Sequence, residues 1–329
     1  MNIEKMVIQA IELYSNKEYD KSLNIYFKIL RTNIPKEVKR VIYFNAGLCY
    51  FSKYSYIDSE KYFKKSFDLG YHTCGYELCM SYLFNDNYLD GYKYYNYRHV
   101  EFLKLPIKRV YDLKDITGNV LVLNEQGFGD EILFSRVIEK ITTPCYYQVY
   151  DENYNLFKDI FKNDNITFFT ERSFNIEFVN KFDCFCYTGD LFSKNIIDNG
   201  IIPYGFKSDN NSTGNVGLVW NTNKKSKNSE ERSIDISKLE SLINSDLTIH
   251  NLQKGISDER MINYDFKDFL DTKKVIDTLD CVYTVDTSVA HLSALLGKKT
   301  YILYDSYLDW RWKSKYYNNF ELLNIKDLH

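Results

Sequence analysis

The sequence has little proline, no strong excess of charge of either sign and no long apolar run. Of its 329 residues only 4 are proline, and 42 Lys and Arg stand against 45 Asp and Glu, a formal net charge of −3. A chain without a global positive field does not attract a nucleic-acid backbone, so we expect no general nucleic-acid binding. No apolar run reaches the roughly 18 residues that a membrane span requires, and residues 1–5 lack the basic-then-apolar order of a signal peptide. We therefore expect a cytoplasmic protein without a membrane span.

Motifs that hold metals or cofactors are also missing. The 7 cysteines include no Cys-x-x-Cys pair and have no His nearby at metal-ligand spacing, so we expect reduced, mostly buried thiols. Cys184 and Cys186 alternate in a segment that is typical of a strand. The chain lacks the G-x-x-x-x-G-K-[ST] phosphate loop and the three-glycine dinucleotide fingerprint, so nothing indicates ATP hydrolysis or a nicotinamide. No cofactor and no metal are expected.

The first 103 residues have the apolar periodicity of helices and a single proline, Pro35. Links between the periodic stretches have the length that antiparallel helices use. We expect helices near 3–15, 18–31, 36–51, 56–69, 73–84 and 88–103. The spacing of small and aromatic residues is that of a tetratricopeptide repeat at Ala46, Gly47, Tyr50, Ser59, Phe63 and Ser66. A helical bundle whose aromatic spacing is simply its core is the alternative. Repeats of this kind bind extended segments, which makes a protein or peptide partner a hypothesis.

From about residue 117, short apolar runs alternate with helical segments, the pattern of a parallel sheet. The polar stretch 208–214 predicts a linker between two such α/β halves, residues 104–207 and 214–329. Two successive halves imply a cleft, with ligands at the carboxyl ends of the strands. The fold class is thus α/β with an N-terminal all-α helical-repeat domain. Strands are expected at 120–124, 145–150, 166–170, 182–187, 216–220, 247–252, 281–285 and 300–304, and helices at 131–140, 235–244, 271–279 and 287–296.

One strand, 281–285, runs directly into a helix and carries polar residues at the turn. Asp286, Thr287 and Ser288 fall where free backbone N–H groups and the helix dipole favour an anion such as a diphosphate. His291 lies one helical turn further, so its imidazole can reach the same ligand. The alternative is that these residues only cap the helix.

A second polar turn follows the strand at 120–124. Gly127 and Gly129 let the backbone come close to a ligand there, and Glu125 and Gln126 precede them at the acceptor-side edge of the sheet. Asp130 completes the segment. A carboxylate beside a cleft can remove a proton from a sugar hydroxyl, the general-base step of an inverting transfer. The alternative is that Asp130 caps the next helix.

Taken together, these blocks resemble one family. Residues from roughly 88 to 313 are similar to the tetratricopeptide-repeat-linked proteins of the heptosyltransferase-like glycosyltransferase group. The matching blocks occur in the order Gly91–Arg98, Glu125–Asp130, Val216–Trp220, Arg232–Ile234, Leu252–Gly255, Asp268–Thr272, Val285–Leu292 and Asp309–Trp312. The resemblance implies the GT-B fold, in which two Rossmann-like halves face a cleft, the first on the acceptor side and the second on the nucleotide-sugar side.

The resemblance also implies roles for the donor side. The turn with Asp286, Thr287, Ser288 and His291 corresponds to the stretch that holds the donor diphosphate, although the group often has Gly at the position of Ser288. Gln253 and Lys254 look like donor-site residues, and a Lys ammonium can offset the charge of the leaving diphosphate. Asn221 and Arg232 resemble phosphate or sugar contacts.

Asp130 falls where the group has the aspartate proposed as catalytic base. Lys254 and Arg232 have a second interpretation, as solvated surface charges. Trp220 either packs in the core or stacks on a base, and Trp310–Trp312 either lines the donor pocket or lies buried. After this last block many GT-B enzymes continue into a helix that crosses back to the first half, and here 17 residues remain to His329.

These observations predict a glycosyltransferase that moves a sugar from a nucleotide-diphosphate sugar to an acceptor, by inversion and without a metal. No Asp-x-Asp metal motif follows a strand. Two alternatives stay open: a non-catalytic tetratricopeptide scaffold with a degenerate glycosyltransferase domain, and a nucleotide-sugar epimerase. Sugar, base, acceptor and oligomeric state are not readable from the sequence, because fold similarity does not carry specificity.

Overall fold

The computed structural model describes residues 2–98, 105–207, 213–223 and 228–327. It divides into two compact units, Met1–Phe102 and Leu103–His329. The boundary expected between residues 103 and 104, and most of the linker expected at 208–214, lie outside the described residues. In the described part of the chain, no helix is both long and apolar enough to cross a membrane.

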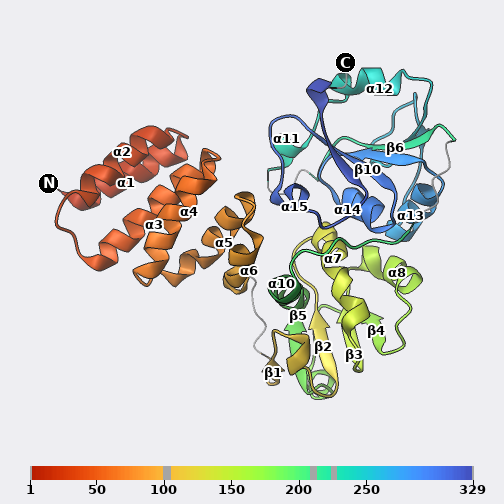
Figure 1. The fold of residues 1–329 in the computed structure, drawn as a ribbon, viewed down its shortest axis with the longest axis horizontal. Helices are drawn as coiled ribbons and strands as arrows, with labels where there is room; N and C mark the ends of the chain where they lie inside the picture. Colours follow the sequence, from red (N-terminus) through yellow and green to blue (C-terminus); the bar gives the residue numbers. More distant parts are fainter. Residues whose placement is uncertain (1, 99–104, 208–212, 224–227, 328–329) are drawn as a thin grey trace. The chain divides into compact units, whose positions relative to one another are not determined.

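The first unit is built from antiparallel helices (Figure 1). They are α1 (Ile3–Ser15), α2 (Tyr19–Leu30), α3 (Lys36–Ser52), α4 (Tyr56–Asp68), α5 (Gly75–Phe84) and α6 (Tyr88–Lys93). The small residues of the repeat-like pattern lie where helices approach closely. A Cβ atom on Gly47 would come within 2.6 Å of the Phe63 ring, and the Ser22 hydroxyl donates to the Ala10 carbonyl over 2.8 Å. The spacing therefore has a packing cause.

The last predicted helix of this unit is shorter than the sequence suggests. The α-helix ends at Lys93 instead of near 103, and a 3₁₀ turn, Tyr95–Tyr97, follows it. In a 3₁₀ turn the side chains at i and i+3 lie on one side. Tyr92 in α6, Tyr95 in the turn and Arg98 directly after it are all buried.

The first half of the second unit is a five-stranded parallel sheet. Its strands are β1 (Lys108–Arg109), β2 (Val120–Leu123), β3 (Cys145–Gln148), β4 (Ile166–Phe169) and β5 (Cys184–Tyr187), in the order β1-β5-β2-β3-β4. Its helices are α7 (Phe128–Phe134), α8 (Asp151–Ile160), α9 (Ile176–Val179) and α10 (Thr188–Asn199). The helix expected at 131–140 starts earlier, because Gly127 caps it, and ends as a 3₁₀ helix, Ser135–Lys140.

The second half is a six-stranded parallel sheet. Its strands are β6 (Asn215–Val219), β7 (Thr248–Asn251), β8 (Ile262–Asn263), β9 (Cys281–Thr284), β10 (Lys299–Tyr304) and β11 (Phe320–Asn324), in the order β11-β10-β9-β6-β7-β8. Its helices are α11 (Ser229–Arg232), α12 (Glu240–Ile243), α13 (Phe269–Asp277), α14 (Ser288–Leu295) and α15 (Trp310–Lys313). The helix expected at 235–244 is a 3₁₀ turn, Ile236–Leu239, followed by α12.

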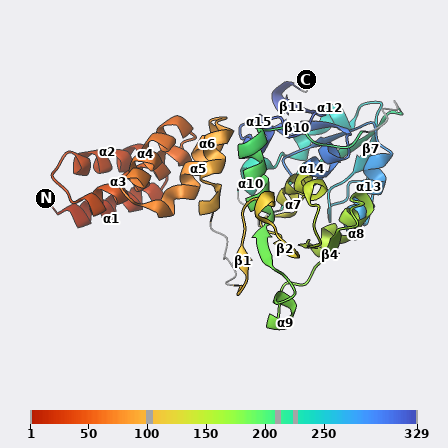
Figure 2. The ribbon, with the colours of Figure 1, turned by 60° about the horizontal axis from the view of Figure 1, so that its bottom comes forward.

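The strand orders place the ligand-binding edges. Read from β8, the second sheet runs third, second, first, fourth, fifth and sixth strand of its half, which is the Rossmann order. The chain changes direction of winding between β6 and β9, and between β2 and β5 in the first half. Ligands bind beyond the carboxyl ends of the strands at such points. The α/β class and the two Rossmann-like halves are thus present, and α7 and α14 lie side by side in both views of the ribbon (Figures 1 and 2).

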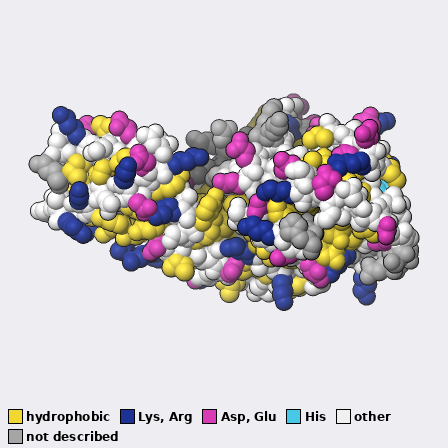
Figure 3. All heavy atoms as spheres, turned by 90° about the horizontal axis from the view of Figure 1, so that it is seen from above, with side chains coloured by type: hydrophobic (Ala, Val, Ile, Leu, Met, Phe, Trp, Pro, Cys, Tyr) yellow, Lys and Arg dark blue, Asp and Glu magenta, His cyan; other side chains and the backbone are white. Residues whose placement is uncertain are grey.

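On the face drawn in Figure 3, Lys and Arg alternate with Asp and Glu, and no large area carries one sign only. This distribution agrees with the formal net charge of −3.

Candidate functional site

A cavity of about 650 Å³ lies where the carboxyl edges of the two sheets face each other. Both halves contribute to its walls. From the predicted sites it brings together Gly127, Gly129, Asp130, Asn221, Arg232, Gln253, Lys254, Asp286, Thr287, Ser288 and His291. A volume of this size accommodates a ligand as large as a nucleotide sugar.

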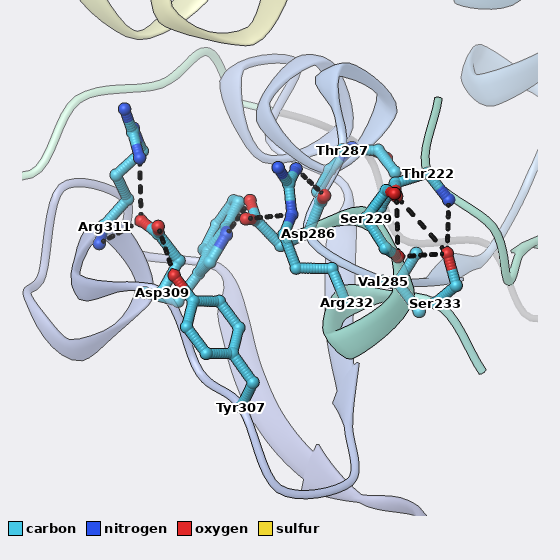
Figure 4. A network of polar contacts seen from close by, with 12 residues as sticks. Thr222, Ser229, Arg232, Ser233, Val285, Asp286, Thr287, Tyr307, Asp309 and Arg311 are labelled. Carbon is cyan, nitrogen blue, oxygen red and sulfur yellow. Dashed lines mark hydrogen bonds and ion pairs between the residues drawn. The ribbon is translucent and has the colours of Figure 1, made fainter. Parts of the chain in front are cut away.

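The turn between β9 and α14 forms one wall of the cavity (Figure 4). Thr287 is the N-cap of α14, and its hydroxyl accepts from the Ala290 N–H over 3.4 Å. Within the protein, Thr287 therefore caps α14. The first residues of α14, Ser288 and Val289, line the cavity, and a helix start of this kind stabilises an anion through its N–H groups and the helix dipole.

Asp286 is engaged within the protein. Its Oδ1 accepts from the Trp312 indole N–H over 2.7 Å, and its Oδ2 forms an ion pair with Arg232 Nε at 3.0 Å. Arg232 also donates to the Asp286 carbonyl (Figure 4). Asp286 thus fixes a guanidinium at the cavity wall, and both oxygens of its carboxylate have partners within the protein.

His291 is almost fully buried and uncharged. Burial, followed by the charge of Arg311, lowers its pKa to about 3. Its ring stacks on Trp312 with the centroids 4.6 Å apart, and its Nδ1 hydrogen-bonds with the Tyr317 hydroxyl over 3.2 Å. His291 can therefore offer a ligand a neutral hydrogen-bonding group but no positive charge.

Gly129 serves the approach of the two halves. A Cβ atom at this position would lie 2.9 Å from His291 Cδ2 and 3.5 Å from Ser288 Cα. The glycine lets the start of α7 pack against the start of α14. Gly129 therefore has a packing role, in addition to the close approach of a ligand that the sequence predicts.

The loops after β6 and β7 supply the polar groups next to α14. The backbone N–H of Asn221 donates to Gln253 Oε1 over 2.9 Å, which ties the two loops together. Lys254 follows Gln253, is exposed, and forms no ion pair with a carboxylate among the described residues. Lys254 and Arg232 therefore place two cations on the wall that holds the α14 N-terminus.

Asp130 faces this wall from α7. Its Oδ1 accepts from Arg311 Nε and Nη2 over 2.9 and 2.7 Å, and its Oδ2 accepts a longer hydrogen bond from the Gly127 N–H, 3.4 Å. Asp130 does cap α7, as the alternative interpretation held, and it also lines the cavity. Arg311 was not among the predicted site residues. Its place in the Asp309–Trp312 block is the signal that could have found it.

Glu125 and Gln126 lie in the turn between β2 and α7 but do not line the cavity, whereas Gly127 and Gly129 do. Glu125 is buried, and its Oε1 accepts from the Gly189 N–H over 2.8 Å at the start of α10. Gln126 has a left-handed backbone, φ 62°, and its carbonyl accepts from the Tyr150 hydroxyl. Glu125 satisfies a backbone N–H at the buried start of α10, and Gln126 forms part of the tight turn after β2.

Glu131, which the sequence did not single out, organises the same edge of the sheet. It is fully buried and accepts from Asn124 Nδ2, Asn153 Nδ2 and the Tyr150 N–H over 2.8, 2.6 and 3.1 Å. Burial raises its pKa to about 7 against the lowering effect of these hydrogen bonds. Glu131 thus joins the ends of β2 and β3 to the start of α8.

Aromatic residues line another part of the cavity, and they were not among the predicted site residues, although Phe128 and Phe269 lie within two of the matching blocks. Phe128 packs edge-on against Tyr150 with centroids 4.8 Å apart and also contacts Phe269 at 5.8 Å. Phe266 lies in the same wall. Flat apolar surfaces of this kind suit a ring such as a nucleobase.

Two sequence alternatives are settled by burial. Trp220 is 4% exposed, packs in the core of the second half and does not line the cavity. Trp310 and Trp312 are both 1% exposed.

Burial raises the pKa of the cysteine thiols, for example that of Cys281 to about 11. Within the described ranges, no group of three His, Cys, Asp or Glu side chains is placed to hold a metal ion.

No family model matches the chain, and no curated protein matches it by sequence. Solved structures do. The heptosyltransferase WaaC of E. coli, with ADP-2-deoxy-2-fluoro heptose, aligns over 62% of this chain and 92% of its own, at 9% identity and a TM-score of 0.41. A mutant O-GlcNAc transferase of Thermobaculum terrenum aligns over 95% and 78%, at 10% identity and a TM-score of 0.31. At these values the likeness carries no argument about function, which rests on the cavity itself.

Proposed function

We propose that the chain is a glycosyltransferase that uses a nucleotide-diphosphate sugar. One observation carries the proposal. At a single cavity between two Rossmann-like sheets, an α14 N-terminus with Lys254 and Arg232 lies on one side, and the carboxylate of Asp130 lies on the other. A leaving diphosphate needs the first set of groups, and an acceptor hydroxyl needs the second.

The donor lies on the second half in this proposal. Its diphosphate accepts from the N–H groups at the start of α14, with Ser288 contributing its hydroxyl, while Lys254 and Arg232 offset the negative charge. The base of the nucleotide packs against the aromatic wall that contains Phe266 and Phe269. These cations and the helix dipole can perform the charge stabilisation that a divalent metal performs elsewhere, which supports a metal-independent transfer.

The transfer itself is proposed as a single displacement. Asp130 Oδ2 takes the proton of the acceptor hydroxyl while the acceptor oxygen forms a bond to the anomeric carbon. The bond from this carbon to the diphosphate oxygen breaks, and the electron pair leaves with the diphosphate. Attack from the face opposite the leaving group inverts the anomeric configuration.

Binding of the donor tests the proposal directly. Thermal unfolding is followed with UDP-, GDP-, ADP-, CMP- and dTDP-linked compounds, since a ligand at 100 times its Kd stabilises the folded state by about 2.7 kcal/mol. We expect at least one diphosphate compound to raise the melting temperature, and the shift to be smaller in Lys254→Ala. No shift with any compound would contradict the proposal. Release of free nucleoside diphosphate without an acceptor would favour an epimerase.

A second candidate is a non-catalytic scaffold. The observation that favours it is that both oxygens of Asp130 already have partners within the protein, Oδ1 in two nitrogens of Arg311 and Oδ2 in the Gly127 N–H. In that case the helical unit binds a protein or peptide, and the cavity holds a ligand without turnover. Nucleotide-sugar binding with no transfer to any acceptor, together with a stable pull-down partner, would favour the scaffold.

A further inference from the structure

The short helix α15 contacts the candidate groups of both halves through two neighbouring residues. Arg311 donates to Asp130 on α7. Trp312 donates to Asp286 at the start of α14. One turn of helix therefore touches the carboxylate proposed as base and the carboxylate that fixes Arg232 on the donor side.

Neighbouring residues of the second half hold Arg311 in place, in addition to its contact with Asp130. Asp309 Oδ1 accepts from the Arg311 N–H over 3.0 Å and from Arg311 Nη1 over 2.8 Å. The guanidinium lies over the Trp310 ring, 4.6 Å from its centroid. Figure 4 shows the contact between Arg311 and Asp309. A guanidinium fixed from two sides presents its remaining donors in one direction.

The contact with Asp130 selects one oxygen. Arg311 Nε and Nη2 both donate to Oδ1, whereas among the described residues Oδ2 accepts just the longer hydrogen bond from Gly127. The side chains of Asp130 and Arg311 are 17% and 18% exposed, so water competes little for the pair. The guanidinium thus orients the carboxylate of Asp130, a residue that lines the cavity, and occupies Oδ1 rather than Oδ2.

Trp312 acts on the donor side in the same manner. Its indole N–H fixes Asp286 Oδ1, and the other oxygen of Asp286 forms the ion pair with Arg232. The Trp312 ring also supports His291 by stacking. Without the indole donor, Asp286 and the guanidinium that it orients lose one fixed point.

We infer that Arg311 and Trp312 are positioning residues, which set the place of the base and the place of the donor-side cation from one short helix. The inference rests on the proposed function. Arg311 acts through Asp130 on the proton transfer, and Trp312 acts through Asp286 and Arg232 on donor binding. Misplacing a group by about 1 Å can cost a hundredfold in rate, so the two residues affect different kinetic constants.

The test is a split between kcat and the donor KM, measured once a donor and an acceptor are in hand. For Arg311→Gln we expect kcat to fall about a hundredfold with the donor KM within about threefold of wild type. For Trp312→Phe, which keeps a ring against His291, we expect the donor KM to rise about tenfold with kcat within about threefold. In Arg311→Ala, added guanidine should restore part of kcat.

Matched controls come from the same half of the chain. Arg260 pairs with two carboxylates, as Arg311 does, but lies away from the cavity, and Trp220 is a buried indole outside it. Arg260→Gln and Trp220→Phe should leave both constants near wild type when folded. Equal effects of Arg311→Gln on kcat and KM, no response to guanidine, or a Trp312→Phe effect on kcat alone would overturn the inference.

A second measurement does not depend on activity. A double-mutant cycle with Asp130→Asn and Arg311→Gln, read in urea unfolding, should give a coupling of about fivefold or more in the unfolding equilibrium constant. A coupling near one would overturn the inference even for an active enzyme. If wild type binds no nucleotide sugar while the coupling is present, the proposed function fails and the contact between the halves stands.

Discussion

The two α/β halves use the same winding but treat their carboxyl edges differently. In the first half the acidic groups at the edge are occupied by the protein: Glu125 by the start of α10, and Glu131 by three donors. In the second half the helix start and Lys254 face the cavity without a carboxylate partner among the described residues. The comparison teaches that the acids of the first edge serve its own structure, whereas the second edge keeps a helix start and a lysine at the cavity, where our proposal places a ligand that carries negative charge.

The strongest test of this contrast is the substitution Asp130→Asn. In our proposal, Asp130 is the acidic residue of the first half that takes part in the reaction, through its Oδ2. We expect turnover to fall by about a thousandfold, because general-base catalysis contributes on this scale, while nucleotide-sugar binding is retained. Steady-state rates and calorimetric titration of the donor measure the two effects. Asp151→Asn, at the exposed start of α8, is the matched control, and wild-type turnover in Asp130→Asn would remove this carboxylate from the mechanism.

Glu131 and His291 give a second contrast, because burial shifts the two groups in opposite directions. The pKa of Glu131 is raised to about 7, so its stabilising contribution is present below pH 4.5 and is lost as pH rises through 7. The pKa of His291 is lowered to about 3, so its contribution is present above pH 6.5 and is lost as pH falls.

Glu131→Gln isolates the acid. The free energy of unfolding of this variant, relative to wild type, should rise by about 3 kcal/mol between pH 4.5 and pH 8, at about 1.4 kcal/mol per pKa unit. Urea unfolding at several pH values measures the difference. A difference that is constant with pH would show that Glu131 titrates normally.

Lys254→Ala examines the second-half edge alone. Loss of a charge-assisted contact to the diphosphate should weaken donor binding by about tenfold to a hundredfold. We expect kcat at saturating donor to change less. Isothermal calorimetry with the nucleoside diphosphate measures the binding, and Lys274→Ala, on the exposed face of α13, should bind as wild type does. Equal affinities for all three proteins would place the diphosphate elsewhere.

Gly129→Ala tests the junction of the halves and has the smallest expected effect. The added Cβ would lie 2.9 Å from the His291 ring, so we expect a loss of about 1 to 2 kcal/mol in unfolding free energy. Gly127→Ala is the control, because its Cβ would meet only Asp130 Oδ2 at an ordinary 3.8 Å. Similar stability of the two variants would mean that α7 and α14 do not pack as described.

The fold was largely readable from the sequence, since apolar runs such as Val120–Leu123 are buried on both faces and are followed by turn residues. Short edge strands such as β1 were not, because two residues give no periodicity. Residues beside each strand end could be placed at the cavity in the same way. The hydrogen-bond partners of those residues could not be predicted from the sequence. The contact between Asp130 and Arg311, for example, spans 181 positions and depends on how the halves pack.

The most direct test of the central claim is a crystal structure of the chain with the nucleotide sugar that gives the largest thermal shift. We predict that the diphosphate lies at the start of α14, within hydrogen-bonding distance of the Ser288 N–H and near Lys254, with the anomeric carbon facing Asp130 Oδ2. A ligand bound with its diphosphate away from α14, or a chain that binds none of the compounds, would contradict the account.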